Sequence, residues 1–234
     1  MAACLCAGCA LWRPDAPPRE ERLLKELDLI SSRRHFLKGD TIFSSEDVCD
    51  RAIILRSGAA KLFHQSAQGK ELVVTIATPG DVICLPKRRG EKFGINAAAL
   101  TEGEYCALTR ERLSFLFTRF PSIGVFLLEQ AQRLLSRAYA AMERLAFLRA
   151  EERLAAAILD LARNAGEVAQ EGIAVTIPLN LSVLAGLSGV VPETAARLLA
   201  SWKREGAIAF KRKRLVLREP SIISGILEGK HLKN

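Results

Sequence analysis

The chain has 234 residues and a mass of 25.6 kDa, a length that suits one large domain or two modest ones. Its 49% hydrophobic and 26% charged residues are typical of a globular protein and argue against extended disorder. The net charge of +8 and the pI near 9.4 favour an anionic partner, either nucleic acid or a membrane surface.

The first 20 residues are expected to form a poorly structured arm. The longest apolar run, Ala2 to Trp12, is far shorter than the roughly 20 residues that cross a bilayer, so no membrane span is predicted. No Lys or Arg precedes this run and Trp12-Arg13-Pro14 is a poor cleavage site, so we expect a cytoplasmic protein with reduced thiols. Three of the six cysteines lie in this arm: Cys4, Cys6 and Cys9.

Residues 21–118 are predicted to form a β-roll preceded by a short amphipathic helix at 21–30. Apolar runs of strand length alternate with glycine turns such as Gly39-Asp40 and Pro79-Gly80-Asp81. Strands at such even spacing indicate a small closed roll or barrel. Short strands are predicted between Phe36 and Leu108, for example Thr41–Phe43, Ala52–Leu55, Ala60–Phe63, Leu72–Ile76 and Val82–Leu85.

A long helix is predicted over residues 119–149. Apolar residues recur there at intervals of three and four, and no glycine follows Gly124. About 28 helical residues would span ~42 Å, which is more than a small domain needs. Two interpretations remain: a helix that lies across one subunit, or the seam of a two-stranded dimer.

Residues 150–234 are expected to form a winged-helix domain. A helical pattern over Glu151–Asn164 is followed by a strand at Ile173–Ile177, helices within 179–206 and a β-hairpin over Ala207–Leu217. The fold class predicted for the whole chain is therefore α+β: an N-terminal β-roll, a long dimerisation helix and a C-terminal winged helix-turn-helix.

The stretch from Leu181 to Lys203 carries a helix-turn-helix pattern. Ser182 is expected to cap the first helix, Gly189 to supply a positive φ in the turn, and Pro192 to open the second helix. Leu198, Leu199 and Trp202 would anchor that second helix. Its exposed side would face DNA, because Arg binds guanine O6 and N7 and Glu accepts from cytosine N4.

A concentration of positive charge follows this pattern. Eight basic residues and one acid lie between Arg197 and Arg218, which suits phosphate contacts. The candidate DNA-binding residues are Ser182, Glu193, Thr194, Ala196, Arg197, Lys203, Lys211, Arg212 and Lys213. No Ser/His/Asp set or phosphate-cradling glycine loop is present, so we do not expect an enzyme.

These residues resemble the CRP/FNR family of bacterial transcription regulators. Ala150–Ala156 is similar to the opening of the DNA-binding domain in the FNR branch, and Val191–Arg197 to the family's recognition helix. The resemblance implies a homodimer on a palindromic promoter site, with Glu193 and Arg197 reading a TGA-type core. Ala196 stands where the FNR branch usually has Ser, so the resemblance does not predict which outer base of the half-site is preferred. The turn at Gln65–Glu71 is expected, by resemblance, to contact RNA polymerase.

The resemblance also suggests an effector. FNR-type sensors hold a [4Fe–4S] cluster on three N-terminal cysteines and a fourth ahead of the dimer helix, which implies Cys4, Cys6, Cys9 and Cys106 here. The Cys4-x-Cys6-x-x-Cys9 spacing is tighter than the usual pattern. Such a cluster would sense oxygen, redox state or nitric oxide and control dimerisation and promoter binding. Cyclic AMP is not expected, because Asp81–Ala99 lacks the family's Gly-Glu and Arg motifs.

Three alternatives to the iron–sulfur cluster remain as possible effectors: zinc, a thiol switch and haem. Zinc could use the same four cysteines, or the thiols could act as a redox switch without metal. Cys84 stands where the carbon-monoxide sensor branch has a haem ligand, although Pro86 replaces the His that this branch carries. Cys49 and Cys84 are otherwise interpreted as buried small residues or spare thiols.

Overall fold

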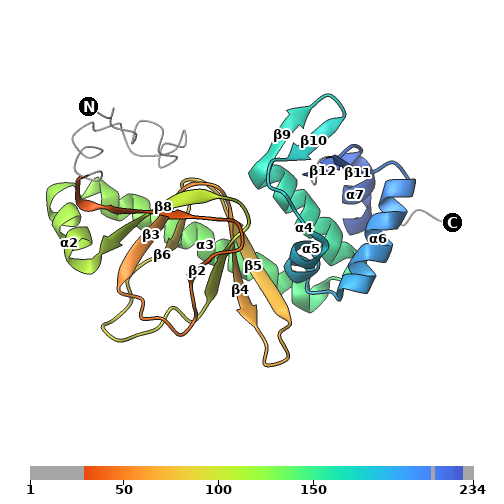
Figure 1. The fold of residues 1–234 in the computed structure, drawn as a ribbon. Helices are drawn as coiled ribbons and strands as arrows, with labels where there is room; N and C mark the ends of the chain where they lie inside the picture. Colours follow the sequence, from red (N-terminus) through yellow and green to blue (C-terminus); the bar gives the residue numbers. More distant parts are fainter. Residues whose placement is uncertain (1–28, 212–213, 229–234) are drawn as a thin grey trace. The chain divides into compact units, whose positions relative to one another are not determined.

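The computed structural model describes residues 29–211 and 214–228, shown in Figure 1. They fall into two compact units, and each is described by itself. The first comprises the described residues up to 63 together with 76–137, and the second comprises 64–75 together with the described residues from 138 onward.

Two four-stranded sheets build the β-roll. The first has the order β1-β8-β3-β6, with antiparallel neighbours, and comprises β1 (Ser32–Phe36), β8 (Gly103–Thr109), β3 (Arg51–Ser57) and β6 (Val82–Cys84). The second has the order β2-β7-β4-β5 and comprises β2 (Thr41–Phe43), β7 (Asn96–Ala99), β4 (Ala60–Gln65) and β5 (Glu71–Ala77). The predicted roll is confirmed.

Both faces of the first sheet are covered, because successive side chains on a strand point to opposite sides. Ile53 and Leu55 of β3 face the second sheet and pack with its Phe43, Leu62 and Ala97. The other face packs against helices α2 (Arg110–Arg119) and α3 (Ser122–Phe147). The helix-side core comprises Ala52, Ile54, Val82, Leu108, Leu113, Leu116, Phe120, Ile123, Phe126 and Leu127.

The C-terminal elements form a winged helix-turn-helix, as predicted. Three helices pack together: α4 (Ala150–Ala165), α5 (Leu181–Ser188) and α6 (Pro192–Arg204). A sheet of order β11-β12-β10-β9 and helix α7 (Pro220–Leu227) complete the domain (Figure 1). Its strands are β9 (Gly166–Ala169), β10 (Gly172–Val175), β11 (Ile208–Lys211) and β12 (Arg214–Leu217). Among the largest fully buried side chains are Leu154, Ile158, Leu184, Trp202 and Leu215.

Several boundaries differ from the sequence prediction. Helix α2 falls inside the span predicted for the roll, and the sequence prediction did not name strands β1, β7, β8 and β9 or helix α7. The long helix begins at Ser122 and ends at Phe147, within the predicted 119–149, because Pro121 precedes it and α4 is introduced by extended backbone at Arg149. Most of the predicted helix at 21–30 lies outside the described residues. No single described helix is long and apolar enough to cross a bilayer, although α5 and α6, bent by 104°, pass that test as a pair.

Candidate nucleic-acid interface and effector site

Helix α5 begins at an asparagine cap. Asn180 lies in extended backbone, and its side-chain oxygen accepts a hydrogen bond of 2.8 Å from the N–H of Val183. This bond satisfies one of the backbone donors that a helix start leaves without a partner. The prediction that Ser182 caps this helix is wrong, because Ser182 is the second residue of α5 and is exposed.

A tight turn joins α5 to α6. Gly189 adopts φ +61° and ψ +30°, the left-handed conformation that favours glycine, and its N–H is directed to the carbonyls of Ala185 and Gly186. Pro192 occupies the first turn of α6, where its missing N–H costs no hydrogen bond. The resulting angle of 104° lies within the range of DNA-binding helix-turn-helix motifs.

Helix α6 has one buried and one exposed side. Ala195, Leu199 and Trp202 are buried, and Trp202 keeps only 1% of its surface exposed. Leu198, also predicted as an anchor, is half-buried. The opposite side presents the predicted base-reading residues, of which Glu193, Ala196 and Arg197 are exposed and Thr194 is half-exposed, together with exposed Lys203. This amphipathic arrangement fixes the helix and leaves its first two turns available for contacts.

The basic hairpin forms the wing, and an acidic residue lies beside it. Exposed Lys211 and Arg214 are paired in register at the ends of β11 and β12. The carboxylate of Glu171, between β9 and β10, forms ion pairs with both Lys211 and Arg218. These two cations hold the pKa of Glu171 below its usual range. Arg212 and Lys213 lie outside the described residues.

Glu171 was missed by sequence reasoning because β9 was not recognised. Gly172 follows Glu171 with a φ of +127°, and Gly166 begins β9. Two glycines that bracket a short segment are a hairpin signal, so this element could have been found. Glu171 reduces the net positive charge of the wing.

Helix α3 exposes a continuous apolar stripe. Its buried residues lie in the first turns, whereas large apolar side chains remain exposed at intervals of three, four and seven residues. Leu128 and Met142 keep 69% and 65% of their surface exposed. The stripe comprises Val125, Leu128, Leu135, Tyr139 and Met142. Apolar side chains at this spacing are typical of helices that pair with another helix.

Cys106 lies on β8, directly between Arg33 of β1 and Ile54 of β3. Strand alternation places its side chain on the same face as Ile54 and Leu108, which is the face covered by α2 and α3. Cys106 is 9% exposed and makes no hydrogen bond through its thiol to the described part of the chain. The other three predicted ligands, Cys4, Cys6 and Cys9, lie outside the described residues.

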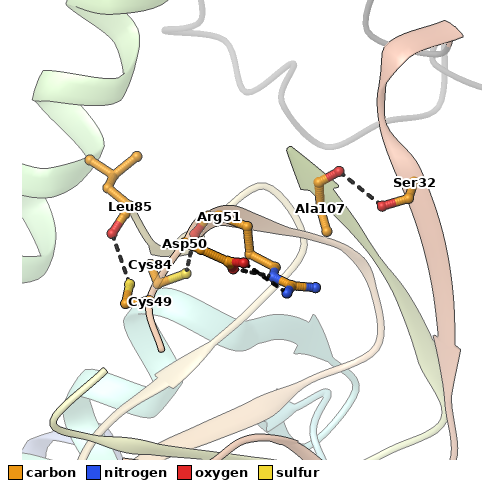
Figure 2. A network of polar contacts seen from close by, with 7 residues as sticks. All are labelled: Ser32, Cys49, Asp50, Arg51, Cys84, Leu85 and Ala107. Carbon is orange, nitrogen blue, oxygen red and sulfur yellow. Dashed lines mark hydrogen bonds and ion pairs between the residues drawn. The ribbon is translucent and has the colours of Figure 1, made fainter. Parts of the chain in front are cut away.

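The chain segment that follows the cysteine-rich arm reaches the same face. Ile30 packs against the helix-side core, and its carbonyl accepts a hydrogen bond of 2.6 Å from Arg112 of α2. Ser32 begins β1 and donates a hydrogen bond of 3.2 Å to the carbonyl of Ala107, the neighbour of Cys106 (Figure 2). Ile30 and Ser32, which are among the first described residues of the chain, therefore lie beside β8, the strand that carries Cys106. Four thiolates are a normal ligand set for a [4Fe–4S] cluster.

The remaining cysteines lie elsewhere in the same unit. Cys49 is buried and Cys84 is half-buried at the end of β6. Within the described residues, no group of three or more His, Cys, Asp or Glu side chains is arranged to hold a metal ion. The candidate cluster site is therefore represented in the structure by Cys106 alone.

Comparisons with known proteins agree with this architecture. The family "Cyclic nucleotide-binding domain" matches residues 33–120, and the family "Crp-like helix-turn-helix domain" matches residues 152–221. The chain is 28% identical to the "Cyclic AMP receptor protein" of Thermus thermophilus over 88% of this chain and 94% of that protein. It is 25% identical to the "Fumarate and nitrate reduction regulatory protein" of Salmonella typhimurium over 94% of this chain and 89% of that protein.

A solved structure shows the same fold. FixK2 from Bradyrhizobium japonicum superposes with a TM-score of 0.72 at 19% sequence identity, covering 84% of this chain and 96% of that one. The names of the two curated relatives point to different signals, so the likeness extends to the architecture and the DNA-binding domain and not to one effector.

Proposed function

Because this chain is a DNA-binding transcription regulator of the CRP/FNR family and not an enzyme, we propose that it is an oxygen- or redox-responsive member whose N-terminal [4Fe–4S] cluster controls dimerisation and promoter binding. The ligands in this proposal are Cys4, Cys6, Cys9 and Cys106. The observation that supports it is the pairing of β1, near the start of the described chain, with β8, which carries Cys106 on the face of the sheet that packs against α3.

The proposed DNA contact uses the exposed side of α6. Arg197 would bind guanine through O6 and N7, and Glu193 would accept from cytosine N4 in a TGA-type half-site. Ala196 offers only a methyl group, and Thr194 and Lys203 flank the reading residues. Lys211, Arg212 and Lys213 of the wing would bind phosphates and supply salt-dependent affinity. Ser182, exposed in the first turn of α5, is available for a further phosphate contact.

The proposed partner of the apolar stripe is a second copy of α3. A pair of such helices would place two recognition helices on a palindromic site, as the two-fold symmetry of a dimer requires. The turn at Gln65–Glu71, which is mostly exposed, is the proposed contact with RNA polymerase.

Ile30 is connected to α3 through the helix-side core. A bound cluster would supply an iron–thiolate centre that is sensitive to oxygen and nitric oxide. Cys106 would hold the arm against β8, while Arg112 holds Ile30, and Ile30 packs into the core that contains Phe126 and Leu127 of α3. A change in how the arm is held would therefore alter the packing at the start of the dimerisation helix, which biases the dimer between states of different DNA affinity.

Anaerobic purification followed by visible spectroscopy tests this proposal. A broad absorbance band that bleaches in air, with iron lost in the Cys106→Ser variant and retained in the Cys84→Ser control, is the expected result. Binding to a palindromic TGA-core duplex should fall together with the iron content. A colourless, iron-free protein that binds this duplex equally well would contradict the proposal, and so would a sharp haem band that Cys84→Ser removes.

A further inference from the structure

Cys49 and Cys84 are held against each other by contacts that cross between their two segments. The Cys49 thiol donates a hydrogen bond of 3.1 Å to the carbonyl of Leu85, the residue after Cys84. The Cys84 thiol donates one of 3.2 Å to the carbonyl of Arg51, two residues after Cys49 (Figure 2). A backbone hydrogen bond of 3.0 Å from Lys87 to the Cys49 carbonyl fixes the same crossing. Each sulfur therefore lies beside the backbone of the other cysteine's segment.

This thiol pair is separated from Cys106 by the sheet. Residues that are paired across neighbouring strands have their side chains on the same face of the sheet. Ser32 pairs with Ala107, Ala107 with Ile53, and Ile53 with Cys84. Ile53 faces the interior of the roll, and Cys49 and Cys84 belong to the same interior cluster. Cys106 precedes Ala107 on β8 and faces the helices. The pair is thus distinct from the candidate cluster site.

The chemistry of the pair favours reaction between its two members. The hydrogen bond with the Cys84 thiol lowers the pKa of Cys49 to about 6, against a rise from burial, and Lys87 lowers it further. The same contact with Cys49, together with burial, raises the pKa of Cys84. Cys49 therefore has thiolate character, while Cys84 keeps its proton. A thiolate is the form that an oxidant converts to a sulfenic acid, and a neighbouring thiol can then condense with that sulfenic acid. Cys49 is 1% exposed and Cys84 is half-buried, so a small oxidant would reach Cys49 past the partly exposed Cys84.

We propose that Cys49 and Cys84 form a peroxide-responsive dithiol that closes reversibly to an intramolecular disulfide. The Cys49 thiolate attacks one oxygen of hydrogen peroxide, the O–O bond breaks, and Cys49 sulfenic acid and hydroxide result. The Cys84 sulfur then attacks the sulfenic sulfur, and its proton leaves with the hydroxyl as water. The hydroxide takes up the proton that Cys49 released when it ionised, so overall the two thiols lose two electrons and peroxide is reduced to two waters. Any dithiol reductant reverses the reaction.

Closure would change contacts at the helix-side core. The Cys49 thiol loses its hydrogen bond to Leu85 when it ionises, and the disulfide removes the Cys84 proton as well, so neither sulfur then donates to the carbonyl of Leu85 or Arg51. Leu85 packs against the same core as Phe126 and Leu127 of α3. The site therefore provides a second input to the start of the dimerisation helix, one that does not require the cluster ligands.

Peptide mapping of the full chain tests the proposal directly. Trypsin cleavage gives peptides 39–51 and 71–87, and each contains one cysteine, Cys49 or Cys84. After treatment with equimolar hydrogen peroxide and alkylation of free thiols, a non-reduced digest should contain these two peptides linked and lighter by two hydrogen atoms. Dithiothreitol should restore both free peptides.

Three variants define the outcome. In Cys49→Ser, loss of the Cys84 thiol should slow by about tenfold or more, because no thiolate neighbour remains. Cys84→Ala should leave Cys49 as a sulfenic acid that a dimedone probe captures. Cys106→Ser should still give the linked peptide, so failure of the cluster proposal would leave this result unchanged. The proposal is overturned if both thiols survive peroxide, if they oxidise independently, or if either one pairs with Cys4, Cys6 or Cys9 instead.

Discussion

The carboxylate of Glu171 is paired with the ammonium of Lys211, at the end of the strand that leads into the basic wing. Arg218 binds the other oxygen of the same carboxylate. One acidic residue thus engages two of the cations that the sequence offers for DNA, and the positive charge of the wing is partly used inside the domain.

Glu171→Gln should strengthen DNA binding, because it releases Lys211 and Arg218 for phosphates. We expect the salt dependence of affinity to steepen by roughly one phosphate contact. Fluorescence anisotropy over a series of salt concentrations measures this slope, with Glu167→Gln on β9 as the control. An unchanged slope would show that neither cation reaches the DNA.

The same residue sets a pH dependence. Its folded-state pKa is lowered by Lys211 and Arg218, so the ion pairs stabilise the fold above the ordinary glutamate pKa and are lost as the pH falls through the lowered value. Wild type and Glu171→Gln should therefore differ in affinity throughout the neutral range. The difference should shrink only below the ordinary glutamate pKa of about 4.3.

Arg197→Ala should remove most sequence recognition. A bidentate contact with guanine contributes about 1–3 kcal/mol of discrimination, which corresponds to roughly 5- to 150-fold in affinity for each half-site, and a dimer on the palindromic site loses two such contacts. Binding to unrelated DNA should change little, because α6 keeps its buried anchors. Competition assays with a scrambled duplex separate the two effects, and Arg110→Ala at the start of α2 serves as a control. Equal losses on both duplexes would assign Arg197 to phosphate binding.

Leu135→Glu should convert a dimer to a monomer. The segment between Leu134 and Met142 contains no acid that would oppose helix pairing, so the protein without a cluster is expected to stay dimeric at micromolar concentration, and the proposed cluster would set how tightly the two helices pair. A glutamate at position 135 would bring two like charges together across the two-fold axis. Sedimentation velocity distinguishes the two states, and the volume-conserving Leu135→Met should stay dimeric. A monomeric wild-type protein would contradict this expectation.

Asn180→Ala should destabilise the DNA-binding domain by about 1 kcal/mol, because the hydrogen bond to Val183 is lost. Ser182→Ala is the matched control and should have almost no effect. Urea unfolding monitored by Trp202 fluorescence in a Trp12→Phe background measures both, since these are the only two tryptophans. Equal effects would show that the cap contributes nothing.

The sequence predicted the elements with strong local patterns. Thr41–Phe43 is a strand with the predicted bounds, and the long helix and the helix-turn-helix follow from apolar spacing, Gly189 and Pro192. Helix α2 was missed because it follows β8 with no glycine or proline between them, and its charged first turn hides the apolar spacing. The cap was misplaced because Asn and Ser both suit that position, and only the backbone decides between residues 180 and 182.

The contact between Cys49 and Cys84 was less predictable for a different reason. Cys49 and Cys84 are 35 positions apart, and their contact depends on how β3 pairs with β6. The pairing of β3 with β6 shifts its register between Ile53 and Ile54, and no sequence pattern predicts this shift. The side of the sheet on which each thiol lies depends on the same register, because a shift of one residue reverses every side chain.

Side chains along β8 and β6 point alternately to the two faces of the sheet, and this alternation has an evolutionary consequence. Cys106 is on the helix-facing side of the sheet, and Cys49 and Cys84 are inside the roll, so a substitution at one place need not displace the sulfur atoms at the other. A lineage that lost the thiol at position 106 would still inherit the two interior thiols, and one that replaced Cys49 would still inherit Cys106.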